Sequence, residues 1–297
     1  MTDTQNEVFK SPVNKIRLFE HGAPGSQNLK LTRKYYTEDM PDGRVKHIVQ
    51  NITDPDIVPY IPDGIGNSTD RQRIPAVLII PGGAFRRLVY NFEGEDVAKW
   101  LNSMGIAAFV LECRLPSDEH DNAEDVPLID AMRAMRVIRG RAQEFGIDEA
   151  KIGVMGFSAG GFMAALLSTA YESDVYADYK YKDEYDKLSA RPDFAVCSYP
   201  VISIDDCIEA GKRYMSEEQV LERISDSKAK ILHKYNPDKL VRPDMPPVFI
   251  CETDDDRTTL SENSVGFYMA ARKAGVSAEL HIFRTGGHGY GCGDDFA

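Results

Sequence analysis

Residues 151–167 constrain the fold more than any other stretch, because they require a buried strand to turn directly into a helix. The stretch begins as an apolar strand sequence, residues 156–160 read Gly-Phe-Ser-Ala-Gly, and residues 162–167 are apolar enough to open a buried helix. Glycines two positions before and after Ser158 remove side chains that would collide where strand and helix nearly touch. The pattern therefore predicts a sharp turn that presents the Ser158 hydroxyl at the end of a strand.

A serine held in such a turn is a candidate nucleophile. The helix that starts directly behind Ser158 points its free N–H groups and its positive dipole end at any oxyanion formed there. The pattern fixes only three positions, so the alternative is a glycine-rich strand–helix turn without chemistry. The expected strand and helix on either side favour the nucleophile.

Strand-like and helix-like segments alternate from residue 76 onward. The strand-like segments are 76–80, 106–111, the strand before Ser158, 194–199, 247–252 and 278–283, and the helical ones include 96–104, 126–145 and 261–274. This alternation is typical of a mostly parallel sheet with helices on both faces. We therefore expect an α/β fold over 1–297 as a single domain.

The flanking segments are less regular. Residues 29–36 and 45–52 alternate in polarity and predict two antiparallel N-terminal strands, which brings the expected total to eight strands. Residues 53–75 are rich in proline and glycine and are expected to be loop. Residues 203–240 are polar and helical, with a capping-box start at 216–219, and form a small insertion that is either a lid over the site or an ordinary surface excursion.

Charge and composition exclude several classes of partner. The formal net charge of -12 argues against nucleic acid and against an anionic membrane surface. Residues 1–7 are polar and acidic, so no signal peptide is visible, and no apolar run approaches the roughly 18 residues of a membrane helix. Five cysteines without a C-x-x-C pair indicate reduced, buried thiols. We expect a cytoplasmic protein.

A nucleophilic serine needs a histidine base that is held by a carboxylate, and in a sheet of this type the acid and then the histidine follow the serine. Three histidines follow Ser158. His281 alternates within a strand, which indicates a structural role, and His233 lies in the possible lid. His288 lies in a glycine-rich loop just past the last strand, where a base can reach the carboxyl edge of the sheet. The alternative is a glycine-rich tail with an unrelated histidine.

The acid and the oxyanion hole are expected in two other loops. After the penultimate strand the chain reads Thr-Asp-Asp-Asp-Arg, so Asp254, Asp255 and Asp256 are all candidates on these grounds, and a solvated acidic loop is the alternative. Residues 81–85 read Pro-Gly-Gly-Ala-Phe after the first buried strand. There the N–H groups of Gly83 and Ala84, joined by that of Ala159, would bind an oxyanion, unless the stretch is a plain Gly-Gly turn.

These segments resemble a known family, the α/β-hydrolase esterases related to bacterial acetyl xylan esterases and to small feruloyl-esterase-like enzymes. The resemblance spans about residues 16–293. Besides the oxyanion turn, the serine turn and the loop of His288, it is carried by residues 22–25, 105–111, 114–116, 127–131, 189–194, 199–203, 262–264 and 278–282. It implies the α/β-hydrolase fold for the expected sheet.

The resemblance also implies which acid orients the histidine. Counting back from residues 262–264 places it on Asp255, with Asp256 as the runner-up. The chain departs from the family where residues 259–261 read Thr-Leu-Ser in place of Val-Pro-Val, where Ala84 replaces a glycine, and where Cys113 replaces a tyrosine. None of these changes removes a catalytic group.

The implied function is that of a serine hydrolase with the catalytic residues Ser158, Asp255 and His288. Its expected substrates are small-molecule esters of short acyl groups, first of all acetyl groups on xylo-oligosaccharide-like carbohydrates. No metal or organic cofactor is needed for this chemistry. Other small acyl or feruloyl esters, a peptidase-like activity, and a non-catalytic binding protein on the same scaffold are the alternatives, in that order. The sequence does not indicate the oligomeric state.

Overall fold

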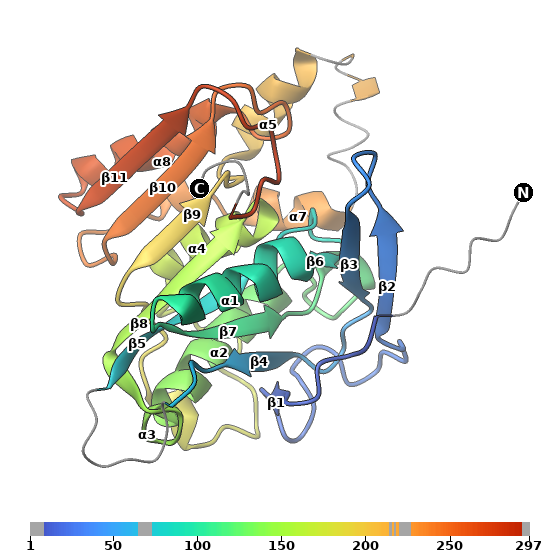
Figure 1. Ribbon diagram of the computed structural model, residues 1–297, viewed down its shortest axis with the longest axis vertical. Helices are drawn as coiled ribbons and strands as arrows, with labels where there is room; N and C mark the ends of the chain where they lie inside the picture. The colour runs from blue at the N-terminus through green and yellow to red at the C-terminus, as the bar shows by residue number, and fades with distance from the viewer. Residues whose placement is uncertain (1–8, 65–72, 214–215, 217, 220–226, 293–297) are drawn as a thin grey trace, which may run out of the picture.

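An eight-stranded, mostly parallel sheet forms the centre of the protein (Figure 1). The structure, a computed structural model, describes residues 9–64, 73–213, 216, 218, 219 and 227–292. The strands of this sheet are β1 (Ile16–Arg17), β4 (Asp56–Tyr60), β5 (Ile74–Ile80), β7 (Ala107–Glu112), β8 (Ile147–Phe157), β9 (Ala195–Ser198), β10 (Val248–Thr253) and β11 (Ala278–Phe283). Their order is β1-β4-β7-β5-β8-β9-β10-β11, in which β7 to β11 run parallel and β4 is antiparallel to both of its neighbours, β1 and β7. The predicted sheet is confirmed.

The strand order reverses direction at β5. From β5 the chain moves to β7 on one side and then crosses to β8 on the other side. Open sheets of this type bind ligands at such a switch point, in the crevice outside the carboxyl ends of the strands. The topology therefore places a site where β5 and β8 end, and the candidate serine follows β8 directly.

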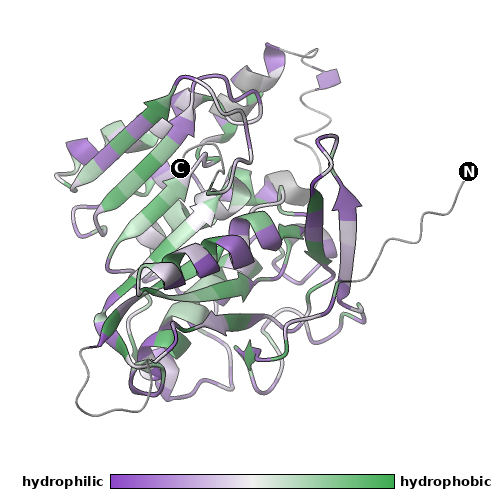
Figure 2. Ribbon diagram, viewed as in Figure 1, coloured by the Kyte–Doolittle hydropathy of each residue, from purple (hydrophilic) through white to green (hydrophobic). Residues whose placement is uncertain are grey.

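Helices cover both faces of the sheet, as the sequence predicts. They are α1 (Asp96–Ser103), α2 (Val126–Gly140), α3 (Ala142–Phe145), α4 (Ala159–Ala170) and α8 (Ser261–Lys273). Figure 1 shows α1 in front of the sheet and α2, α4 and α8 behind it. The central strands are consequently buried on both faces: all residues of β7 are buried, and Figure 2 shows the sheet as the most hydrophobic part of the chain.

The N-terminal hairpin is antiparallel, as predicted, but it belongs to a second sheet. β2 (Lys34–Asp39) and β3 (Val45–Gln50) pair with each other, and β6 (Leu88–Val89) joins them in the order β2-β3-β6. The first strand begins later than expected, at Lys34 instead of residue 29. The hairpin stands at one end of the main sheet (Figure 1).

Two local predictions are wrong. The expected loop at 53–75 contains β4. Because β1 pairs only with Asp56 and Ile57, the rest of β4 is an edge of the sheet, where a proline such as Pro59 is tolerated. The expected single helix over 126–145 is divided into α2 and α3 at Gly140, a poor helix former whose Cα lies against the ring of Tyr185.

Charged side chains tie the N-terminal segment to the main sheet. Glu112, at the end of β7, is fully buried. Its Oε2 accepts hydrogen bonds from Lys15 Nζ at 2.6 Å, Arg33 Nη1 at 2.7 Å and Tyr35 Oη at 2.8 Å. A buried carboxylate needs such partners to offset its lost hydration. These bonds hold the start of the hairpin against the sheet.

The described part of the insertion at 203–240 is mostly helical. It contains α5 (Ile204–Lys212), α7 (Ser227–Lys234) and the short η4 (Pro237–Lys239). The predicted capping box is present, because Ser216 N–H donates to Gln219 Oε1 and Gln219 N–H donates to Ser216 Oγ. Residues 214, 215, 217 and 220–226 of the insertion lie outside the described residues. Among the described residues, no helix has the length and apolarity to cross a membrane.

Candidate active site

Ser158 occupies the sharp turn that the sequence predicts. Its backbone has φ 52° and ψ -117°, and it links the end of β8 to the start of α4. A Cβ at Gly156 would lie 2.0 Å from the carbonyl oxygen of Gly160, and a Cβ at Gly160 would lie 2.0 Å from that of Ile80. Only glycine fits at both positions, which is why the strained backbone of Ser158 can be held by close packing on both sides.

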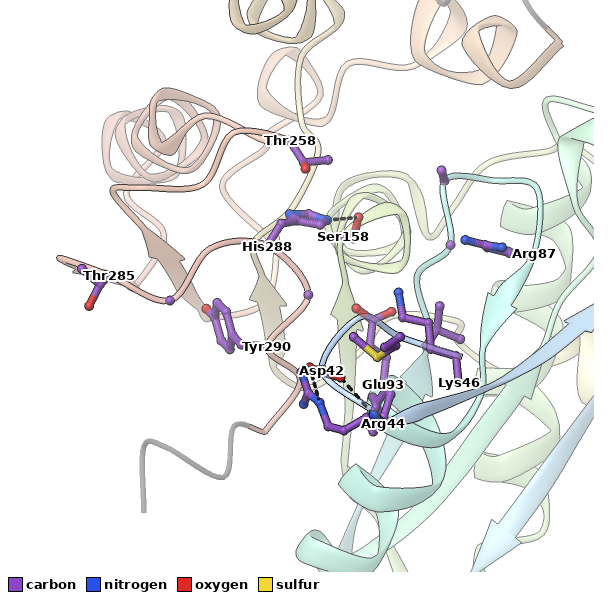
Figure 3. A pocket seen from close by; sticks show the side chains of 17 residues that line it. Asp42, Arg44, Lys46, Arg87, Glu93, Ser158, Thr258, Thr285, His288 and Tyr290 are labelled. Atoms are coloured by element: carbon purple, nitrogen blue, oxygen red, sulfur yellow. Dashed lines mark hydrogen bonds and ion pairs between the residues drawn. The ribbon is translucent and has the colours of Figure 1, made fainter. Parts of the chain in front are cut away.

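His288 connects this serine to an acid. Its Nε2 lies 2.8 Å from Ser158 Oγ, and its Nδ1 lies 2.6 Å from Asp256 Oδ2. Figure 3 shows the imidazole pointing at Ser158 across the pocket. The ring of Tyr199 packs edge-on against the imidazole with ring centroids 5.0 Å apart. The structure therefore joins a hydroxyl, an imidazole and a carboxylate from three separate loops in one hydrogen-bonded chain.

The carboxylate at His288 is Asp256 and not Asp255, which corrects the expected acid by one residue. Asp255 Oδ1 instead accepts the backbone N–H of Gly287 at 2.8 Å and is exposed. Asp256 is 3% exposed, and its Oδ1 accepts the N–H groups of Thr258 at 2.7 Å and Thr259 at 3.0 Å. These bonds turn Asp256 inward.

Residues 259–261, which depart from the family pattern, add a further contact to Asp256. Thr259 Oγ1 donates to Asp256 Oδ2 at 2.9 Å, a contact that valine cannot make. Burial raises the pKa of Asp256, but the hydrogen bonds from His288 and from the Thr259 and Thr258 N–H groups outweigh it and lower the pKa overall. The carboxyl group is therefore held in its charged form.

The turn after β5 adopts an unusual backbone. Gly83 has φ 138° and Ala84 has φ 56°, so the residue that replaces the family's glycine keeps a left-handed conformation. A Cβ at Gly83 would lie 2.1 Å from the carbonyl oxygen of Arg87. Gly83 and Ala84 line the same cavity as Ser158, and Ala159 is the first residue of α4, where helix N–H groups have no partner within the helix.

The other two candidate histidines lie elsewhere. His281, on β11, has its Nε2 2.6 Å from Glu279 Oε1 and packs against Phe249. His233 is exposed on α7. Neither is brought to Ser158.

A cavity of about 800 Å³ opens over Ser158 and His288. One wall comes from the hairpin of β2 and β3, a part of the chain to which the sequence reasoning gave no role in the site. The lining residues from outside the expected site are Met40, Asp42, Arg44, Lys46, Arg87, Val89, Phe92, Glu93, Thr258, Thr285 and Tyr290. Figure 3 shows Arg44, Lys46 and Glu93 around the floor of the cavity. No local motif marks these residues, because they come from the hairpin, from residues 87–93 and from the loops after β10 and β11, which meet only in the folded chain.

The insertion at 203–240 supplies none of the described residues that line this cavity. It contacts the start of α8, which follows the acid loop: Arg213 forms an ion pair with Glu262 at 3.1 Å, and Ser203 N–H donates to Asn263 Oδ1 at 3.0 Å. A lid role for the insertion stays a prediction. In the described part of the chain, no group of His, Cys, Asp and Glu side chains is arranged to hold a metal ion.

The chain is similar to several known proteins. Residues 65–270, more than half of the 297 residues, match the BD-FAE family. The acetyl ester-xyloside bifunctional hydrolase of Caldicellulosiruptor lactoaceticus is 35% identical, with a TM-score of 0.68 over 93% of this chain and 88% of the other.

Two curated proteins are also similar. An acetylxylan esterase of Xylanibacter ruminicola is 31% identical over 74% of this chain and 42% of that protein. Endo-1,4-beta-xylanase B of Butyrivibrio fibrisolvens is 31% identical over 76% of this chain and 34% of that protein. The chain thus spans less than half the length of the curated relatives it matches.

Proposed function

The chain belongs to the BD-FAE family of α/β-hydrolase esterases, and from this premise we propose that it hydrolyses carboxylic esters of short acyl groups through a serine acyl-enzyme. The observation that carries the proposal is the hydrogen-bonded chain from Ser158 through His288 to Asp256, with distances of 2.8 and 2.6 Å. A serine hydroxyl becomes nucleophilic when an imidazole can accept its proton.

The acylation step uses all three side chains. Ser158 Oγ attacks the ester carbonyl while His288 Nε2 accepts its proton, and the carbonyl π electrons move to the oxygen. Asp256 accepts the hydrogen bond of Nδ1–H, which fixes the tautomer and stabilises the imidazolium. The tetrahedral intermediate then expels the alcohol, which takes the proton from Nε2, and leaves the acyl group on Ser158.

Deacylation repeats the sequence with water. His288 accepts a proton as water attacks the acyl carbonyl, and the carboxylic acid leaves when Ser158 Oγ regains its proton. In both steps the charge on the carbonyl oxygen needs hydrogen-bond donors. We assign these to the N–H groups of Gly83, Ala84 and Ala159, since Gly83 and Ala84 line the cavity beside Ser158 and Ala159 begins α4.

For the substrate we propose an acetyl ester of a small carbohydrate of the xylo-oligosaccharide kind. Three similar proteins are named as an acetylxylan esterase, an acetyl ester-xyloside bifunctional hydrolase and an endo-1,4-beta-xylanase, and these names concern this chemistry. A cavity of about 800 Å³ is within the usual range for small-molecule sites. Its polar lining residues, among them Lys46, Thr285 and Tyr290, suit a hydroxylated ligand.

A hydrolysis panel tests the function. p-Nitrophenyl acetate, butyrate and octanoate, acetylated xylo-oligosaccharides and a feruloyl ester are incubated with the wild type, with Ser158→Ala, and with Ser103→Ala as a matched control at an exposed serine on α1. We expect acetate release from the oligosaccharides, unchanged in Ser103→Ala and lost in Ser158→Ala.

Each other outcome has a defined meaning. Hydrolysis of activated acetyl esters by Ser158→Ala at the wild-type rate would refute the nucleophile. Activity on p-nitrophenyl or feruloyl esters without acetate release would keep the serine mechanism and refute the carbohydrate substrate.

A further inference from the structure

Glu93 is a buried carboxyl group that the proposed mechanism does not use. It lies in η1 (Asn91–Glu95), a single π-helical turn between β6 and α1, and it is 5% exposed. Single π-helical turns are rare in proteins, and those that occur are often found at functional sites. Figure 3 shows its side chain reaching into the cavity below Ser158. Burying a carboxyl group costs much desolvation free energy, so its presence here indicates a specific role.

The partners of Glu93 come from the segments that build the site. Its Oε2 accepts the N–H of Gly82, in the oxyanion turn, at 2.8 Å. Its Oε1 accepts the hydroxyl of Tyr199, just past β9, at 2.9 Å. The hydroxyl oxygen of Tyr199 in turn accepts the N–H of Gly291 at 3.0 Å, in the loop that carries His288.

Tyr199 fits this connecting role in two further ways. It is fully buried with φ 37°, a strained value for a residue with a side chain. Its ring packs edge-on against both His288, at 5.0 Å between centroids, and Tyr290, at 4.5 Å. The hydroxyl therefore holds the histidine loop from below while the ring limits the orientation of the imidazole.

We propose that Glu93 is a positioning residue: through Gly82 and Tyr199 its carboxylate fixes the oxyanion turn relative to His288, and its charge stabilises the imidazolium formed during the reaction. The inference rests on the proposed serine mechanism and adds to it a second carboxylate besides Asp256. One side chain thereby sets the spacing between the oxyanion donors and the base, which controls the rate of an acyl transfer.

The charges around Glu93 agree with this role. The pKa of Glu93 is raised overall, because the effect of burial is larger than the opposing effects of Tyr199, the charge of His288, the Gly82 N–H and the charge of Lys46. All of these partners donate or are positive, so each favours the charged form of the carboxyl group. The groups in direct contact with His288 are Asp256, Ser158, Thr259 and Tyr199, of which Asp256 is the one carboxylate, and Glu93 adds a second negative charge that acts on the imidazole without touching it.

The test compares two variants with a matched control. Glu93→Gln keeps the shape but removes the charge, and Tyr199→Phe keeps the ring but removes the hydroxyl. Glu95→Gln changes a carboxyl group in the same turn that pairs with Lys99 on the surface at 2.8 Å, outside the site. For each protein, kcat and KM for p-nitrophenyl acetate are measured between pH 5 and 9, together with the rate at which a fluorophosphonate labels Ser158.

We expect kcat of Glu93→Gln to fall about 10- to 100-fold with little change in KM, because a hydrogen bond to a charged group contributes about that factor. We also expect the acid limb of kcat/KM to move to lower pH by roughly 0.5–1 unit, since the imidazolium loses a stabilising charge. Tyr199→Phe should lower kcat without moving the acid limb, and Glu95→Gln should behave as the wild type.

Two results overturn the proposal. An unmoved acid limb in a folded Glu93→Gln protein would show that the residue has only a structural role. If Glu93→Gln fails to fold, Tyr199→Phe becomes the test, and an unchanged kcat in that variant refutes the connection. Failure of the proposed esterase function can be told apart from failure of the positioning role. If no ester is hydrolysed but the fluorophosphonate labels Ser158 more slowly in Glu93→Gln than in the wild type, the positioning role is supported and the substrate class is refuted.

Discussion

Exchanging each of two adjacent acids for asparagine tests the structure against the family pattern. Asp256→Asn removes the charge that faces His288 Nδ1 at 2.6 Å, a distance typical of a charge-assisted hydrogen bond. Because Asp256 is 3% exposed, water cannot replace the lost acceptor. Asparagine can also present its NH₂ group to Nδ1, which favours the wrong tautomer of the imidazole.

The expected loss of kcat in Asp256→Asn follows from this geometry. Loss of the orienting carboxylate in a serine–histidine–acid system lowers kcat by about 10³- to 10⁴-fold, equivalent to about 4–5.5 kcal/mol of transition-state stabilisation. Asp255→Asn is the matched control, since an exposed side chain that accepts one N–H, from Gly287 at 2.8 Å, can keep this bond through its amide oxygen. We expect its kcat to stay within about threefold of the wild type.

The assay is kcat/KM for p-nitrophenyl acetate near pH 8, with thermal melting to show that both variants are folded. The reasoning is refuted if Asp255→Asn loses the activity while Asp256→Asn keeps it. Equal, small losses in both variants would also refute it, because they would mean that neither carboxylate orients the base.

Two further predictions concern stability. Gly156→Ala places a Cβ 2.0 Å from the carbonyl oxygen of Gly160 and should lower the free energy of unfolding in urea by about 2 kcal/mol or more. Gly266→Ala is the control, because a Cβ there meets nothing within 4 Å, and it should be neutral or stabilising. Equal effects of the two substitutions would contradict the packing argument. Burial raises the pKa of Glu252 from 4.5 to about 9. Between these pH values the folded chain therefore binds more protons than the unfolded chain. The stability that the protonated group contributes is full below about pH 4.5 and is lost as the pH rises to about 9. Glu252→Gln should therefore show a smaller loss of stability between pH 5 and 9 than the wild type, and parallel pH profiles of urea unfolding would refute this linkage.

Two predictions at the site that depend on neighbouring residues in the chain agree with the structure. The turn at Ser158 is an example, since the strand, the two glycines and the helix that shape it all lie within residues 151–167. The glycine-rich loop of His288 is another, because a residue just past a parallel strand must lie at the carboxyl edge of the sheet. Periodicity and turn chemistry are local properties, and here they were sufficient.

Neighbouring residues in the chain do not decide whether Asp255 or Asp256 faces His288. Both residues lie in the same acidic loop after β10, and a count by family pattern selected the wrong one. Which carboxyl group turns inward depends on the hydroxyl of Thr259 and on the position of His288, which lies 32 residues beyond Asp256. A shift of one residue in a loop exchanges a buried side chain for an exposed one, so counting cannot resolve it.

The chain order alone establishes that a serine at the end of β8 and a histidine past β11 share one edge of a parallel sheet, because strand direction and connection length follow from the pattern of apolar residues. The hairpin wall of the cavity and the contacts of Glu93 with Gly82 and Tyr199 come from segments that no motif connects. Such contacts form only when the two sheets and the loops pack together, since side-chain partners far apart in sequence are selected by shape and by the need to satisfy buried polar groups.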